Sequence, residues 1–161
     1  MSRDKPREMA LALPPPVRDY LAAQHVMTLA TQGADGPWAA AVFYAQMDDD
    51  LVFVSSPTSR HGIHLAQDAR CSAAIQGAAE DWASIRGIQI DGRVELLQGD
   101  AATPARERYA QKFPFVRPEV AAPPILQALA RVQWYRLRIA RLFFIDNASG
   151  LGKRQLFAAE G

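Results

Sequence analysis

Short apolar runs, separated by polar and glycine-containing turns, recur along this chain and predict a series of β-strands. In the segment near the C-terminus, Tyr135, Leu137 and Ile139 alternate with Arg136 and Arg138, which is typical of a strand with one buried face. Segments of this kind lie at 26–31, 38–44, 51–55, 71–76, 88–97 and 134–146. Glycines and Asp35 between the first two predict a tight hairpin.

Helical patterns occupy the intervals between several of these strands. They cover 17–24, 60–67, a region that contains Ala105, Tyr109 and Phe113, and 125–131. We expect Thr58 or Ser59 to cap the second helix and Asp100 to cap the third. Gly92 interrupts the strand 88–97 and predicts a bulge or bend. The pattern favours a mainly β fold, a small barrel of about six antiparallel strands with short helices, over a doubly wound sheet.

Length and composition add the domain plan and exclude several classes of function. The chain fits an N-terminal arm over 1–16 and one barrel domain over 17–161. The net charge is +1 and no basic stripe is visible, which argues against a nucleic-acid partner. No apolar run reaches the roughly 18 residues of a membrane helix, and no secretion signal is visible, so we expect no membrane association and a cytoplasmic location.

The reactive side chains do not form a recognisable catalytic or metal motif. Cys71 is the single cysteine and is expected to be a small buried residue. His61 and His64 lie three residues apart on one predicted helix, but no carboxylate pair completes a shell, so no metal site is predicted. His25 begins an apolar strand and is expected to be structural. Ser55-Ser56 does not form the elbow that a serine nucleophile requires.

The turn between strand 51–55 and helix 60–67 is the most distinctive segment. Serines end the strand, Pro57 stops it, and the helix begins with free backbone amides in its first turn. Hydroxyls, these amides and the side chains of Arg60 and His61 are the donors that a phosphate dianion requires. The alternative is an ordinary capped helix with a solvated Arg60.

Several short pieces around this turn occur in a familiar order. They are Gln24-His-Val, Ala41-Val-Phe-Tyr44, Thr58-Ser-Arg-His61, Ile85-Arg-Gly-Ile-Gln-Ile-Asp-Gly92, Arg106-Glu-Arg-Tyr-Ala-Gln-Lys-Phe-Pro114 and Phe144-Ile-Asp-Asn-Ala-Ser-Gly-Leu-Gly-Lys153. Together they resemble the FMN-binding split β-barrel of pyridoxamine 5′-phosphate oxidase-like proteins, most closely the small YhbP-type branch. The resemblance covers about residues 17–155.

This resemblance implies a homodimer with FMN in a groove between the subunits. It implies ring contacts from Ala41, Val42 and Phe43, ribityl or phosphate contacts from Ser55 and Ser56, phosphate contacts from Ser59, Arg60 and His61, and ring or ribityl contacts from Gln76. Trp82, which precedes a strand beside the expected groove, is a further candidate for ligand contact. The implied function is an oxidoreductase that moves electrons between a reduced nucleotide and a small acceptor. No residue is an evident acid or base, so no catalytic residue is assigned.

Two departures from the family pattern limit what the resemblance implies. Many relatives carry Arg and Lys where this chain has Ser59 and His61, and a histidine is only partly charged at neutral pH. We therefore expect either weaker FMN binding above neutral pH or binding that relies on Arg60 and the helix amides. The C-terminal Arg and Trp of true pyridoxamine 5′-phosphate oxidases have no match, so vitamin B6 oxidation is not expected. The alternative is a non-catalytic flavin- or haem-binding module, with His25, His61 or His64 as an axial haem ligand. A deazaflavin in place of FMN also remains open.

Overall fold

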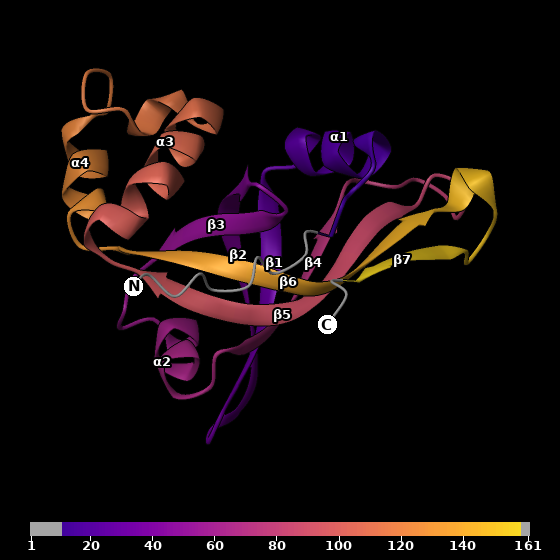
Figure 1. The fold of residues 1–161 in the computed structure, drawn as a ribbon, viewed down its shortest axis with the longest axis horizontal. Coiled ribbons are helices and arrows are strands. Elements are labelled where there is room, and N and C mark those ends of the chain that lie inside the picture. The colour runs from indigo at the N-terminus through magenta and orange to yellow at the C-terminus, as the bar shows by residue number, and fades with distance from the viewer. Residues whose placement is uncertain (1–10, 159–161) are drawn as a thin grey trace, which may run out of the picture.

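A single antiparallel sheet organises residues 11–158, the part of the chain that the computed structural model describes (Figure 1). Its strands are β1 (Val26–Gly33), β2 (Gly36–Met47), β3 (Asp50–Ser55), β4 (Arg70–Gln76), β5 (Arg86–Leu97), β6 (Gln133–Asp146) and β7 (Arg154–Ala158). The helices are α1 (Pro15–Ala23), α2 (Arg60–Gln67), α3 (Thr103–Lys112) and α4 (Pro123–Leu129). Short 3₁₀ turns lie at Gly99–Ala102, Pro114–Val116 and Asn147–Ser149.

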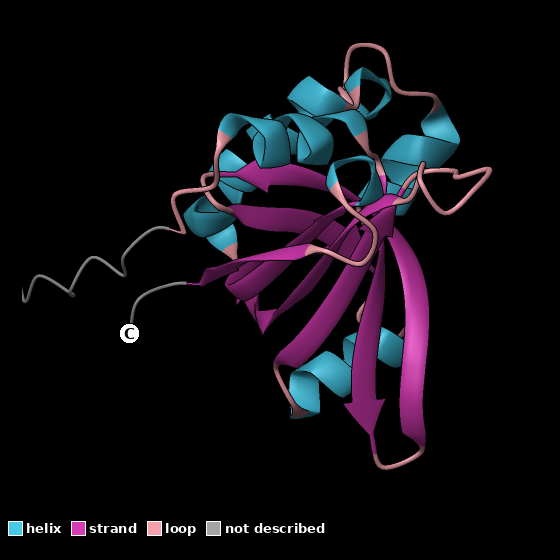
Figure 2. Ribbon diagram, turned by 90° about the vertical axis from the view of Figure 1, so that its right-hand side faces the viewer, coloured by secondary structure: helices cyan, strands magenta, loops and turns pink. Residues whose placement is uncertain are grey.

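The sheet closes into a barrel because β3 pairs with both β2 and β6. The strand order is β3-β2-β1-β4-β5-β6-β7, and the additional β3–β6 pairing joins the ends of the first six strands. This confirms the predicted barrel of antiparallel strands. The sequence did not predict β7, which pairs with the part of β6 from Arg141 to Ile145 and extends the sheet outside the closed barrel. Figure 2 shows the strands fanning out from the end where most helices gather.

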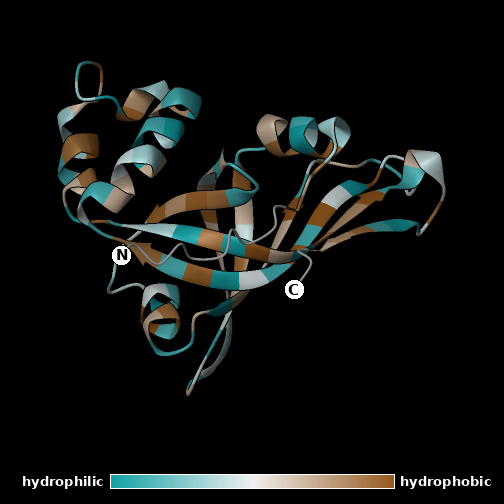
Figure 3. Cartoon of the chain, in the orientation of Figure 1, coloured by the Kyte–Doolittle hydropathy of each residue, from teal (hydrophilic) through white to brown (hydrophobic). Residues whose placement is uncertain are grey.

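The inward side chains of the barrel form the main core. Met27, Leu29, Ile75 and Leu142 are each almost completely buried, and they alternate with outward residues along their strands. Figure 3 shows this alternation as hydrophobic and hydrophilic bands along β5 and β6. The period of two in the sequence therefore decides which side of each strand faces the core.

A second apolar cluster lies where α3 packs on the outside of β2 and β3. It contains Ala45, Met47, Val52, Ala105 and Tyr109, among others. The prediction that Asp100 caps this helix is wrong. The residue at the cap position is Ala102, without a side-chain cap, because the 3₁₀ turn Gly99–Ala102 leads directly into the helix.

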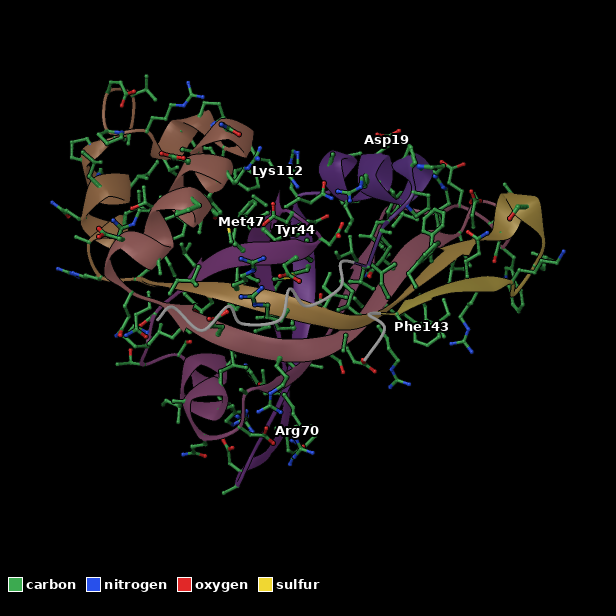
Figure 4. All side chains as sticks on the ribbon, in the orientation of Figure 1. Asp19, Tyr44, Met47, Arg70, Lys112 and Phe143 are labelled. Carbon is green, nitrogen blue, oxygen red and sulfur yellow. The ribbon has the colours of Figure 1, made fainter. Side chains whose placement is uncertain are left out.

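The last residue of α3 ties this cluster to the helix α1. Lys112 Nζ donates hydrogen bonds to the carbonyl oxygens of Leu21 (3.2 Å) and Gln24 (2.5 Å), and it lies over the ring of Tyr44 (Figure 4). Burial lowers the pKa of Lys112 to about 8. The ammonium group therefore satisfies carbonyls at the end of α1 that the helix itself leaves unpaired.

The predicted bulge at Gly92 is confirmed. The β5–β6 register shifts between Asp91 and Gly92, so that Gly92 lies opposite Ile139. A Cβ atom at position 92 would lie 2.0 Å from the carbonyl oxygen of Arg138, which leaves room only for glycine.

The N-terminal part of the described chain joins the core. Leu11 and Leu13 are buried, and Pro15 and Pro16 form the first turn of α1. The predicted arm over 1–16 thus lies partly outside the described residues, and its described part packs on the barrel. Cys71 is buried as predicted, and burial raises the pKa of its thiol to about 12. Within residues 11–158 no helix is long and apolar enough to cross a membrane.

Candidate functional site

The turn that joins β3 to α2, from Ser55 to Gly62, gathers hydroxyl and imidazole groups; we call it the serine turn. Ser59 caps α2, as predicted, since its Oγ accepts a hydrogen bond from the amide of Gly62 at 3.1 Å. Ser59 Oγ also donates to the carbonyl oxygen of Ser56 at 2.7 Å. Ser55 Oγ lies 2.5 Å from His61 Nε2, so the ends of the turn are joined by a hydrogen bond.

Gly62 allows the serine turn to close tightly. A Cβ atom at this position would lie 2.6 Å from the carbonyl oxygen of Ser56 and 2.9 Å from Ser59 Oγ. The amides of Arg60 and His61 have no hydrogen-bond partner within residues 11–158. The first turn of α2 therefore presents two free donors next to the serine hydroxyls, an arrangement suited to an anion.

His61 supplies less positive charge to this turn than a lysine would. Its pKa is lowered, first by burial and second by the nearby His64. The imidazole is therefore mainly neutral at pH 7, and it can accept the hydrogen bond of Ser55.

The side chain of Arg60 contacts Asp35 and Trp38 and not the other predicted phosphate ligands. Its Nε lies 2.8 Å from Asp35 Oδ2, and one terminal nitrogen donates to the carbonyl oxygen of Asp35 at 3.0 Å. The guanidinium carbon lies 4.5 Å from the centre of the Trp38 ring. Arg60 is therefore held at the β1–β2 turn, and neither the convergence with His61 nor the solvated alternative describes its position.

Arg60 belongs to a group of four residues, Thr31, Asp35, Arg60 and His64, which we call the hairpin clamp. That these four residues come together was not predicted from the sequence. The His64 side chain is only 3% exposed, with Nε2 2.6 Å from Asp35 Oδ1 and Nδ1 3.0 Å from Thr31 Oγ1. The hydrogen bond from His64 is the main reason that the pKa of Asp35 is lowered. The spacing of Arg60 and His64, four residues apart on one helix, was the signal that could have found the clamp. No cluster of His, Cys, Asp and Glu that could hold a metal occurs in the described chain.

One edge of β2 is free beside the serine turn. β3 pairs with β2 only from Tyr44 to Met47 and ends at Ser55, so no described strand covers that edge from Gly36 to Phe43. The amide of Tyr44 donates to the carbonyl oxygen of His25, toward β1. Because backbone groups alternate in direction, those of Ala41 and Phe43 point to the free edge. The predicted ring-edge residues thus supply unpaired backbone groups.

The outward side of the sheet, which we call the outer face, is built from small side chains near this edge. One row across the strands joins Ala41, Thr28, Ala74, Gln89 and Phe143 through direct register pairs. The next row includes Phe43 and Val26, each more than 40% exposed. Exposed apolar side chains at this place, Val26 and Phe43, are suited to contact an aromatic ring or another subunit.

The remaining predicted ligands divide between this face and other places. Gln76 is exposed on β4 and shares the outer face with Ala74. The side chain of Val42 points inward and packs against the core, so only its backbone is near the free edge. Trp82 is 77% exposed in the loop before β5, where its carbonyl accepts a hydrogen bond from Asn147 at 2.7 Å. The structure therefore brings together Ser55, Ser56, Ser59 and His61, and it places Ala41, Phe43 and Gln76 on the outer face, with β1 between β2 and β4.

Comparison with known sequences gives a family match along most of the chain. The family model described as pyridoxamine 5′-phosphate oxidase matches residues 13–146. A UPF0306 protein of Klebsiella pneumoniae is 31% identical over 137 residues, which cover 84% of this chain and 86% of that protein. The UPF0306 protein YhbP of Escherichia fergusonii is 28% identical over 140 residues, with 86% and 88% covered.

Solved structures with the same fold include proteins that are described as binding different ligands. A conserved hypothetical protein of Mycobacterium tuberculosis has a TM-score of 0.72 at 20% identity, with 96% of each chain covered. A haem-binding protein of Mycobacterium smegmatis has a TM-score of 0.69 at 23% identity; the match covers 91% of this chain but 60% of that one. A FAD-binding protein of Mesorhizobium loti has a TM-score of 0.62 at 18% identity, with 79% and 87% covered. With its barrel, its element order and the match over 13–146, the chain belongs to the pyridoxamine 5′-phosphate oxidase family, in the branch of the UPF0306 (YhbP) proteins.

Proposed function

We propose that the protein is a cytoplasmic FMN-binding flavoprotein that works as a homodimer and transfers electrons between a reduced nucleotide and a small acceptor. The observation that carries this proposal is the position of the free β2 edge, which begins where β3 ends in the serine turn. An edge of unpaired amides next to a hydroxyl-lined helix start matches a ligand with a planar polar ring and a phosphate tail.

Each part of the site would hold one part of this ligand. The hydroxyls of Ser55, Ser56 and Ser59, with the amides of Arg60 and His61, would bind the phosphate. The backbone of Ala41 and Phe43 would bind the polar edge of the ring, while Gln76 would supply an amide from the outer face. The bound flavin supplies the redox chemistry, and the protein supplies position and charge. A second subunit on the outer face would cover the exposed Val26 and Phe43 and exclude water.

The weak charge of the serine turn leads to a pH dependence of binding. His61 has a lowered pKa in the free protein, and a phosphate dianion beside it would favour the charged imidazolium. Binding would then take up a proton, so we expect FMN affinity to increase several-fold from pH 8 to pH 6.5. Fluorescence titration of FMN measures this change. His61→Gln keeps a hydrogen-bonding side chain that does not titrate, and equal pH profiles for the variant and the wild type would contradict the role of His61.

Gly62→Ala tests the serine turn directly. The added methyl group would lie 2.6 Å from the carbonyl oxygen of Ser56, so the turn must open and its free amides must move. We expect FMN affinity to fall at least about tenfold, which corresponds to about 1.4 kcal/mol. Titration of the purified variant with FMN, followed by flavin fluorescence and absorption, gives this number.

Gly77→Ala is the matched control for that experiment. Its added methyl group would have no neighbour closer than 3.5 Å, so the same chemical change should leave FMN affinity unchanged. Retained affinity in Gly62→Ala, or equal losses in both variants, would show that FMN is not bound at the serine turn. A wild-type protein that does not bind FMN would exclude the proposed function as a whole.

A haem-binding module without turnover is the second candidate. The fold neighbour from Mycobacterium smegmatis is described as haem-binding. His25 is the exposed histidine of the described chain, whereas ring nitrogens of His61 and His64 are hydrogen-bonded to side chains. His25 would therefore be the axial ligand. An absorption spectrum separates the candidates: flavin bands support FMN, and a strong Soret band after haem addition supports haem.

A further inference from the structure

A charged groove of about 680 Å³ opens on the outer face, at the ends of β1 and β4 nearest to α2 and beside the middle of β5 and β6. Gln32, Arg70, Ser72, Asp91, Arg93 and Arg141 are among the residues that line it. Along the strands it lies beyond the row of Ala41 and Phe143. Figure 4 shows Arg70 below the barrel beside α2 and Phe143 near β7, so the groove and the apolar part of the outer face are different places.

Three arginines lie directly opposite one another across the strands, and two of them, Arg70 and Arg93, line this groove. Arg93 on β5 is in register with Arg70 on β4 and with Arg138 on β6. The bulge at Gly92 produces this alignment, since it shifts the β5–β6 register immediately before Arg93. Like charges in directly opposite positions destabilise a sheet unless negative charge lies close to them.

The acidic residues nearby compensate the neighbours of Arg93 rather than Arg93 itself. Asp68 binds Arg70 through both carboxylate oxygens, and its closest approach is 2.7 Å. Asp91 binds Arg141, and Glu95 lies 3.0 Å from Arg138. Arg93 exerts only a weaker attraction on Asp68, and it makes no ion pair or side-chain hydrogen bond within residues 11–158.

The groove therefore presents one guanidinium, that of Arg93, that makes no ion pair within residues 11–158 and lies between two paired ones. Three arginines and two aspartates line it, and the exposed hydroxyl of Ser72 lies on the same face. A guanidinium offers paired N–H donors that match the two oxygens of a carboxylate or phosphate group. An anion bound here would also relieve the repulsion across the three strands.

We propose that this groove binds the oxyanion group of a small ligand, a phosphate or a carboxylate, with Arg93 as the main ligand. The site differs from the serine turn in its elements and its charge, and it does not depend on FMN binding. It gives the protein a second anion site on the same outer face.

Inorganic pyrophosphate and citrate are suitable probes, because one carries phosphate and the other carboxylate oxygens. Isothermal titration of the full chain should show binding of at least one of them, and Arg93→Gln should weaken it at least about tenfold, the effect of losing one charge-assisted contact. Which probe binds more tightly identifies the class of oxyanion. Arg131→Gln is the matched control, since Arg131 is an exposed arginine outside the groove, and it should leave the affinity unchanged.

Three results would overturn the proposal. One is the absence of binding for both probes at millimolar concentration. Another is an equal loss of probe affinity in Arg93→Gln and Arg131→Gln, which would indicate that the anion is attracted to the cationic surface in general. The third is binding that Gly62→Ala removes and Arg93→Gln does not, which would place the anion in the serine turn. Circular dichroism and thermal unfolding of each variant show that the fold is retained, and Arg93→Lys, which keeps charge without the paired donors, should recover part of the affinity.

Discussion

Gly92→Ala is expected to destabilise the fold by about 3 kcal/mol or more, the largest effect of a single methyl group that we predict for this protein. The added Cβ would lie 2.0 Å from the carbonyl oxygen of Arg138, and both sides of this contact are backbone in paired strands. Side-chain rotation cannot relieve such a contact, so β5 and β6 must separate locally. Urea unfolding followed by circular dichroism measures the change in free energy of unfolding.

The same substitution at Gly77 is the control for stability as well. Gly77 lies after β4 and its added methyl group meets only ordinary contacts, so a loss below about 0.5 kcal/mol is expected there. A loss below 1 kcal/mol in Gly92→Ala would mean that the bulge can move, and that the register of Arg93 with Arg138 is not fixed by Gly92.

His64→Ala is expected to cost about 2–4 kcal/mol of stability. The side chain is almost fully buried and bonds to both Thr31 and Asp35, so its loss leaves a cavity and removes the partner of the buried Thr31 hydroxyl. The β1–β2 turn would also lose one of its hydrogen bonds to α2, while the contacts of Arg60 with Asp35 would remain. Urea unfolding again gives the free energy, and proteolysis near the β1–β2 turn reports on local opening.

His25→Ala is the control that shows how much stability is lost when an exposed imidazole is removed. His25 is exposed and makes an edge contact with Phe113, so its removal should cost less than about 1 kcal/mol. His64→Gln can replace one of the two hydrogen bonds, so its free energy of unfolding should lie between those of the wild type and His64→Ala. Equal stability of His64→Ala and His25→Ala would show that the hairpin clamp does not hold α2 to the sheet.

The barrel was predictable because most of its strands either alternate between buried and exposed positions or, like β3, form a continuous apolar run. β6 shows this most clearly, with Tyr135, Leu137 and Ile139 buried. β7 was not predictable on the same basis: from Arg154 to Leu156 every residue is exposed, so no apolar period marks the strand. The prediction that Asp100 caps α3 was wrong because a 3₁₀ turn that contains Asp100 precedes the helix. A single aspartate does not distinguish a 3₁₀ turn from a capped helix start.

The candidate site was predictable where it is local in the chain. Ser59 as the cap of α2 and the contact between Ser55 and His61 depend on a segment of a few residues, and local spacing describes such segments well. The position of Arg60 was not predictable, because Asp35 reaches it only when the β1–β2 hairpin folds against α2. The same holds for Arg93, whose neighbours Arg70 and Arg138 come from two other strands.

The pairing of β3 with β6, which closes the barrel, also limits the order in which the chain can fold. β1, β2, β3 and β4 emerge early during synthesis and can pair as local neighbours, but the partner of β3 on its other side, Gln133–Leu137, is among the last parts to appear. Until then β3 presents an unpaired apolar edge, a surface that favours association with other chains. Closure by such distant segments predicts slow folding, and ribosome-bound chains that lack β6 should depend on chaperones for solubility.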